Sequence, residues 1–226
     1  MPQSKKEDII FMYNTVIFDL DGTLIDSEEG IMNSFAYTFE KLGMAVPSRG
    51  EMGAFIGPPL FYSFETICGL GKEGAERAVE IYREYFGKYG VNQNTVYDGV
   101  EKMFAELKSR GKTLLLATSK YELYALQILK NLGLDKYFSF AAGSEKDGGR
   151  GTKAEVISYV LNKTGAEAES AVMVGDRMHD TKGALEAGVD SIGALWGYGS
   201  RTELLGGGAT HLADAPEDVV RIVCGE

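Results

Sequence analysis

The amino-acid sequence predicts an α/β protein: a doubly wound, Rossmann-like parallel sheet with an inserted all-α cap domain. Two observations support this prediction. Short apolar runs alternate along the chain with amphipathic helical patterns, which is typical of parallel strands covered by helices on both faces. The alternation is then interrupted once, by a long stretch that has helical periodicity and no comparable strand.

Five short apolar runs predict the strands of the sheet. They are rich in Val, Ile, Leu, Phe and Ala, and such runs suit strands that are buried on both faces. The runs are 15–19, 113–117, 138–141, 171–174 and 191–195.

Two amphipathic patterns between these runs predict helices of the core. In each pattern, apolar residues recur three and four positions apart and therefore share one helical face. The residues are Val100, Met103, Phe104 and Leu107 in one helix, and Val156, Ile157, Val160 and Leu161 in the other.

Residues 28–95 are predicted to form a helical cap inserted into a core that comprises 1–27 and 96–226. Gly57-Pro58-Pro59 must interrupt any helix in this stretch. The cap is expected to lie over the carboxyl end of the first strand, where open α/β sheets bind their ligands. Its two apolar helical faces consist of Ile31, Phe35, Phe39 and Leu42, and of Ala75, Ala78, Val79, Tyr82 and Phe86.

The charge balance excludes two classes of partner. The chain has 33 Asp and Glu against 23 Lys and Arg, a formal net charge of −10, whereas nucleic acids and membrane surfaces select clustered basic residues. No apolar run is long enough to span a membrane, and neither a leader peptide nor a disulfide framework is indicated. We therefore expect a cytoplasmic protein with no nucleic-acid or membrane partner and, without coiled-coil heptads, a monomer.

Asp19 and Asp21 directly follow the first predicted strand. Two carboxylates two positions apart lie on the same side of an extended segment, and they repel each other unless a cation or a proton sits between them. Gly22 then allows a sharp turn. An Asx turn at the end of the strand is an alternative explanation, whereas an EF-hand loop would have its glycine at position six instead of four.

Two further polar segments carry helix-start signals. Thr118 and Ser119 follow the second predicted strand, and Ser119 opens an S-x-x-E capping box that would begin a helix there. Thr152 opens a second box, which places Lys153 in the first helical turn. A cation in that turn opposes the helix dipole, so we expect Lys153 to have an anionic partner; a solvated surface lysine is the alternative.

Asp176 follows the fourth predicted strand, and Asp180 lies one helical turn later. Asp176 is interpreted as the cap of the next helix, with Asp180 on the same face and His179 between them turned toward solvent. The four segments together put acids, hydroxyls and a lysine at one edge of the sheet. Carboxylates there can bind Mg²⁺ and one of them can attack phosphorus, while the lysine and hydroxyls hold the other phosphate oxygens.

These residues resemble, in order, the four motifs of the haloacid dehalogenase-like hydrolase superfamily. The likeness covers the whole chain. Segments 55–60 and 97–100 are similar to cap and hinge segments of the phosphoglycolate phosphatase-like branch, whose members are often described as phosphoglycolate phosphatases or 5′-nucleotidases. The motifs are Asp19-Leu20-Asp21-Gly22-Thr23-Leu24, Thr118-Ser119, Lys153 and Gly175-Asp176-Arg177-Met178-His179-Asp180.

The resemblance implies a role for each of these residues. Asp19 would be the nucleophile and a Mg²⁺ ligand. Asp21 would act as general acid and then as general base, with its backbone carbonyl on the metal. Asp176 would be a metal ligand, and Asp180 would orient the metal's ligands or bind it through water. The residues that would bind the transferring phosphoryl group are Thr118, Ser119 and Lys153.

We therefore expect a Mg²⁺-dependent phosphatase of a small phosphorylated metabolite, such as phosphoglycolate or a nucleoside 5′-monophosphate. A phosphomutase of the β-phosphoglucomutase type and a non-catalytic phosphate-binding module are the alternatives, and Asp21 argues against the second because binding alone needs no general acid. An acidic pocket in an acidic protein repels a phosphate dianion, so the composition also predicts strict metal dependence.

Substrate selection is expected to lie in the cap. Its aromatic segment 61–65 would suit a nucleoside, and a basic residue would suit a carboxylate. Tyr82 and Phe86 have core spacing, so Arg83 beside them is expected to face solvent. The basic candidates are Arg49, Lys72, Arg77 and Arg83.

Overall fold

A six-stranded parallel sheet forms the centre of the protein. The computed structural model describes residues 13–146 and 148–226, so the first twelve residues of the predicted core lie outside the described part. The strand order is β5-β4-β1-β6-β7-β8, and every neighbouring pair is parallel. The strands are β1 (Thr15–Phe18), β4 (Thr113–Tyr121), β5 (Phe140–Ser144), β6 (Ala171–Gly175), β7 (Asp190–Ala194) and β8 (His211–Ala213).

All five predicted strands are confirmed, with β5 displaced toward the C-terminus of its apolar run. β8 was not predicted, because its three residues are too few to form a recognisable pattern and only Ala213 among them is fully buried. It pairs with β7 alone and forms the edge of the sheet.

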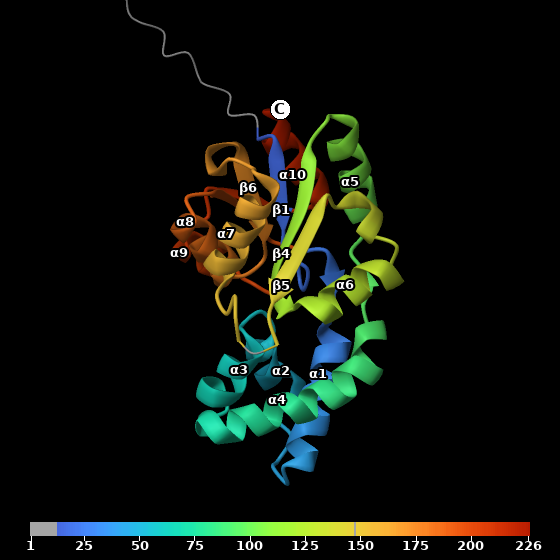
Figure 1. Cartoon of the computed structure of the whole chain (residues 1–226), viewed down its shortest axis with the longest axis vertical. Helices are drawn as coiled ribbons and strands as arrows, with labels where there is room; N and C mark the ends of the chain where they lie inside the picture. The colour runs from blue at the N-terminus through green and yellow to red at the C-terminus, as the bar shows by residue number, and fades with distance from the viewer. Residues whose placement is uncertain (1–12, 147) are drawn as a thin grey trace, which may run out of the picture.

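Helices cover both faces of the sheet (Figure 1). Val16 and Phe18 of β1 belong to one apolar core, and Ile17 between them belongs to the other, as the two-residue period of a strand requires. Of the helices that cover the sheet, those that contribute to the first core are α5 (Val100–Ser109), α6 (Glu122–Asn131) and α10 (Pro216–Cys224). Those that contribute to the second are α7 (Lys153–Thr164) and α8 (Met178–Glu186), with α9 (Arg201–Gly206) packed beside α8.

The two core helices predicted from apolar spacing are confirmed as α5 and α7. In α5 the buried side chains are those of Val100, Met103, Phe104 and Leu107. In α7 the predicted apolar positions are all buried, and Lys153 is buried with them. A lysine on the buried face of a helix requires a charged partner, which the site provides.

A group of helices lies beyond the carboxyl ends of the strands, at the bottom of Figure 1. Their core is aromatic: the Phe35 ring has its centroid 4.9 Å from that of Phe64 and 5.1 Å from that of Tyr82. The predicted break at Gly57-Pro58-Pro59 is confirmed, because the next helix begins only after Pro59. The helices are α1 (Glu28–Lys41), α2 (Arg49–Met52), α3 (Leu60–Tyr62), which continues as a π-helical turn (Ser63–Ile67), and α4 (Gly71–Lys88).

A short antiparallel ribbon joins this helical group to the sheet. It pairs β2 (Ile25–Asp26) with β3 (Thr95–Val96), where the chain leaves the core and where it returns. Two-residue strands carry no sequence pattern, and neither was predicted. In the described part of the chain, no helix combines the length and the apolar character that crossing a membrane demands.

Candidate active site

Three buried acidic side chains converge at the carboxyl edge of the sheet. Asp19 directly follows β1, Asp176 directly follows β6, and Asp180 lies in the first turn of α8. Their exposed fractions are 5%, 0% and 1%, and each offers a carboxylate oxygen within 4.8 Å of the others. The convergence follows from the topology, because the carboxyl ends of neighbouring parallel strands lie at the same edge.

Lys153 lies between two of these acids. Its ammonium nitrogen is 2.7 Å from Asp19 Oδ1 and 2.8 Å from Asp180 Oδ1, and it donates a hydrogen bond of 3.2 Å to the backbone carbonyl of Ala117. The predicted capping box at Thr152 and the predicted anionic partner of Lys153 are both confirmed. Burial disfavours the charged ammonium, but Asp180 and Asp19 more than compensate and hold the pKa of Lys153 above its ordinary value.

Burial and mutual repulsion disfavour the ionised form of two of these acids. Burial, reinforced by the charge of Asp180, raises the pKa of Asp19 to about 6 even though Lys153 acts in the opposite direction. Burial and the charges of Asp180 and Asp19 also raise the pKa of Asp176 well above its usual range. The contact of Lys153 with Asp19 is an ion pair without hydrogen-bond alignment, and the buried Asp19 Oδ1 accepts no hydrogen bond from the described residues.

This donor set fits a divalent cation such as Mg²⁺. Mg²⁺ prefers hard oxygen ligands and is usually held by a small number of carboxylates. Asp19, Asp176 and Asp180 supply such oxygens, each within 4.8 Å of the others. If all are ionised, the four carboxylates of the site face two ammonium groups, a formal charge of −2 that one such cation would cancel.

The Asp21 side chain lies apart from the three converging acids and faces Lys120. The Lys120 ammonium donates hydrogen bonds of 2.8 Å and 2.7 Å to the two Asp21 carboxylate oxygens. Gly22 makes the predicted turn with φ of +79°, and a side chain there would collide with the Asp176 carboxylate. Lys120 was missed in the sequence reasoning, although its position at the carboxyl end of a predicted strand, next to Thr118 and Ser119, was a usable signal.

The segment with Thr118 and Ser119 differs from its prediction. Thr118 is buried at 1% exposure, and its hydroxyl accepts a hydrogen bond from the backbone N–H of Lys120. The predicted helix start at Ser119 is wrong: β4 continues to Tyr121 and α6 begins at Glu122. The capping box fails because the Glu122 carboxylate is engaged elsewhere, by the Gly143 N–H and the Arg150 guanidinium.

The interpretation of Asp176 as a helix cap is also wrong. The residue that precedes α8 is Arg177, and its N–H donates to the Asp180 carboxylate at 3.0 Å. Asp176 instead accepts hydrogen bonds from the Thr23 hydroxyl at 3.1 Å and from the Tyr198 N–H at 2.8 Å. Its carboxylate is therefore oriented by two segments that are distant in sequence.

The loop of residues 196–199 belongs to the site and was not predicted. Trp196 donates from its indole N–H to the Thr23 carbonyl, and the Tyr198 hydroxyl donates to Asp26 at 2.8 Å. Gly199 allows the loop to approach closely, because a Cβ there would lie 1.9 Å from the Asp176 carbonyl oxygen. Sequence reasoning could have found this loop, because it follows the predicted strand 191–195 at the edge of the sheet where the acids gather.

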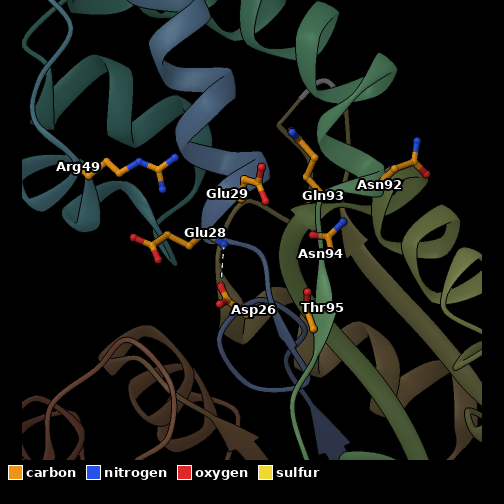
Figure 2. Close-up of a pocket in the computed structure, with 8 residues that line it drawn as sticks. All are labelled: Asp26, Glu28, Glu29, Arg49, Asn92, Gln93, Asn94 and Thr95. Carbon is orange, nitrogen blue, oxygen red and sulfur yellow. Dashed lines mark hydrogen bonds between the residues drawn. The ribbon is translucent and has the colours of Figure 1, made fainter.

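A separate polar cavity of about 350 Å³ lies beside the β2–β3 ribbon, and Figure 2 shows its lining. Three of its residues are acidic and one, Arg49, is basic. None of them is a predicted catalytic, phosphate-binding or metal-binding residue, and the acidic lining disfavours a phosphate. The lining consists of Asp26, Glu28, Glu29, Arg49, Asn92, Gln93, Asn94 and Thr95.

The environment of Arg83 corrects another expectation. Tyr82 and Phe86 are buried as predicted. Arg83, however, is only partly exposed: its guanidinium lies 5.0 Å from the ring centroid of Tyr121 and donates to the Lys146 carbonyl. Arg83 meets the end of the sheet because β4 extends beyond its predicted end and brings Tyr121 within reach of α4.

Comparisons with known proteins agree with this geometry. The family model described as haloacid dehalogenase-like hydrolase matches residues 16–194. A 5′-nucleotidase of Pseudomonas aeruginosa is 41% identical over 204 residues, which cover 90% of this chain and 92% of that protein. The tyrosine-protein kinase PtkA of Mycobacterium tuberculosis is 40% identical over 184 residues, 81% of this chain and 62% of the kinase. The crystal structure of a predicted phosphatase from Clostridium acetobutylicum is 38% identical, with a TM-score of 0.92 over 95% of this chain and 100% of that one.

Proposed function

Because the chain belongs to the haloacid dehalogenase-like hydrolase family, we propose that it is a Mg²⁺-dependent phosphatase acting on a small phosphomonoester through an aspartyl phosphate. The observation that carries the proposal is the ion pair between Lys153 and Asp19 within a buried group of acids. In this pair the Asp19 carboxylate supplies a nucleophilic oxygen, and the Lys153 ammonium beside it can neutralise negative charge on the transferred phosphoryl group.

The first chemical step would transfer the phosphoryl group to the protein. An oxygen of Asp19 attacks phosphorus, the bond from phosphorus to the leaving-group oxygen breaks, and Asp21 supplies a proton to that oxygen. In the second step Asp21 removes a proton from water, whose oxygen attacks phosphorus and releases Asp19 and inorganic phosphate. The residues that would bind the phosphoryl oxygens are Thr118, Ser119 and Lys153.

Mg²⁺ would be held by Asp19, Asp176 and the backbone carbonyl of Asp21, with Asp180 binding directly or through water. When bound, the cation neutralises charge on the phosphoryl oxygens and reduces the repulsion among the carboxylates. The convergence of the Asp19, Asp176 and Asp180 oxygens supports this assignment.

The substrate we propose is phosphoglycolate or a nucleoside 5′-monophosphate, bound between a core of residues 1–27 and 96–226 and a cap of residues 28–95. The similarity to a 5′-nucleotidase supports the second choice. Phe61 and Tyr62 of the cap are 37% and 45% exposed and provide aromatic surface for a base. We propose a monomeric cytoplasmic enzyme.

The test of the proposed function is the Asp19→Asn variant, which keeps the shape of the side chain and removes the nucleophile. Phosphate release from phosphoglycolate, AMP and p-nitrophenyl phosphate should fall at least about 10³-fold, because no other group can form the covalent intermediate. The exposed Asp135 provides a matched control, and Asp135→Asn should leave the rates unchanged. EDTA should abolish the wild-type activity and Mg²⁺ should restore it.

Three outcomes would overturn the proposal. The first is full activity of Asp19→Asn. The second is conversion of a hexose phosphate into its isomer, followed by ³¹P NMR, without release of inorganic phosphate. The third is transfer of phosphate from ATP to protein tyrosine with no hydrolysis of any monoester.

A further inference from the structure

We propose that Lys120 is the positioning residue of Asp21, and that it determines how well the enzyme acts on substrates with poor leaving groups. The inference rests on the proposed function, because it assigns Asp21 the proton transfer. The structural observation is independent of it: one ammonium group donates to both Asp21 oxygens, at 2.8 Å and 2.7 Å.

Lys120 is the sole source of hydrogen bonds to the Asp21 carboxylate among the described residues. Both side chains are nearly enclosed, with exposed fractions of 9% for Lys120 and 11% for Asp21. The Asp21 side chain can rotate about two bonds, χ1 and χ2. Without a hydrogen-bond donor, neither carboxylate oxygen is held in a fixed direction toward the substrate. The orientation of Asp21 therefore depends on Lys120.

On the side away from Asp21, Lys120 packs against α4. Its ammonium lies 4.7 Å from the ring centroid of Phe86 in α4, a cation–π arrangement. Phe86 is 1% exposed, and its ring stacks on that of Tyr82 with centroids 5.5 Å apart. A fixed aromatic face behind the ammonium restricts the lysine to the position in which it meets Asp21.

The two lysines of the site consequently have separate tasks. Lys153 contacts Asp19 and Asp180, whereas Lys120 contacts Asp21. When Asp21 gives its proton to the leaving oxygen it becomes a carboxylate, which the Lys120 ammonium stabilises.

The expected signature is a dependence on the leaving group. An alkyl phosphate must be protonated as it leaves, whereas p-nitrophenyl phosphate departs as a stable phenolate and needs little help. In Lys120→Met, kcat for phosphoglycolate or AMP should fall about 10²-fold, the usual range for a misplaced general acid. With p-nitrophenyl phosphate, the same variant should lose less than about threefold.

Two further variants complete the experiment at saturating Mg²⁺. Lys120→Arg can still donate two N–H groups to a carboxylate and should recover most of the alkyl phosphatase rate. Lys136→Met is the matched control, because the exposed Lys136 also lies over an aromatic ring, that of Tyr137 at 5.0 Å, but outside the site. It should behave as the wild type with both substrates.

Equal losses with both classes of substrate would overturn the inference, since they would mean that Lys120 binds the phosphoryl group or supports the fold. Unchanged rates in Lys120→Met would overturn it as well. If Lys120→Met does not fold, as judged by circular dichroism, the Arg variant and Lys120→Gln provide the same comparison of leaving groups. Failure of the proposed function is distinguishable, because the wild type would then release no phosphate from any substrate.

Discussion

Replacing Lys153 by methionine tests the electrostatic balance of the site. Methionine has similar length and no charge, so the change removes the ammonium without opening a large cavity. Lys153 is 5% exposed and lies 2.7 Å from an Asp19 oxygen and 2.8 Å from an Asp180 oxygen. Without it, two buried carboxylates lose their cation while Asp176 remains beside them.

The expected loss of unfolding free energy is about 3–5 kcal/mol at pH 8, the range for a buried ion pair from which one partner is removed. The loss should shrink at pH 5. The pKa of Asp19 is already raised to about 6, so an unpaired Asp19 takes up a proton there and the buried charge disappears.

The assay is urea unfolding of the purified protein in EDTA, which removes divalent cations. Lys163→Met is the matched control, because Lys163 lies on the same helix, is exposed, and has its ammonium 5.5 Å from the ring centroid of Tyr159. It should change the stability by less than about 0.5 kcal/mol. A loss below about 1 kcal/mol for Lys153→Met, or an equal loss for both variants, would refute the reasoning.

Two other predictions concern the surroundings of Asp176 and of the start of α8. Gly199→Ala would place a Cβ 1.9 Å from the Asp176 carbonyl, and we expect a loss of about 1–3 kcal/mol in urea unfolding together with weaker Mg²⁺ binding by calorimetry; wild-type Mg²⁺ affinity would contradict this. Glu203 is partly buried, yet its hydrogen bond from Arg177, at 2.8 Å, keeps its pKa below the ordinary value of 4.5. A carboxyl group whose pKa is lowered in the folded state stabilises the fold above its ordinary pKa, and this effect is lost as the pH falls. Glu203→Gln should therefore cost about 1–2 kcal/mol at pH 7 and less at pH 3. A cost that does not change with pH would be inconsistent with the ion pair.

The sheet was predictable because its strands carry a local signal. A strand buried on both faces must be apolar at nearly every position, and β1, the segment 114–117 of β4, and β6 satisfy this. The same reasoning fails for β2, β3 and β8, whose two or three residues form no pattern. These short strands exist because the surrounding chain brings their backbones together.

The candidate site was predictable to the extent that its residues follow strands. Asp19 and Asp176 converge because β1 and β6 are parallel neighbours, and the capping box at Thr152 places Lys153 by a purely local rule. The two local interpretations that failed, helix caps at Ser119 and Asp176, failed because longer-range partners took the groups involved. The Glu122 carboxylate, which the capping box at Ser119 needs, accepts a hydrogen bond from Arg150. The Asp176 carboxylate accepts one from the backbone N–H of Tyr198.

The sequence by itself determined the fold class, the family and the residues gathered at the edge of the sheet, because apolar periodicity and motif order are properties of the chain. Only the tertiary structure decided which groups contact one another: Lys120 with Asp21, Tyr198 with Asp176, and Phe86 against the Lys120 ammonium. These pairs are 99, 22 and 34 residues apart. A contact across such distances depends on how helices and strands pack, and no local pattern encodes it.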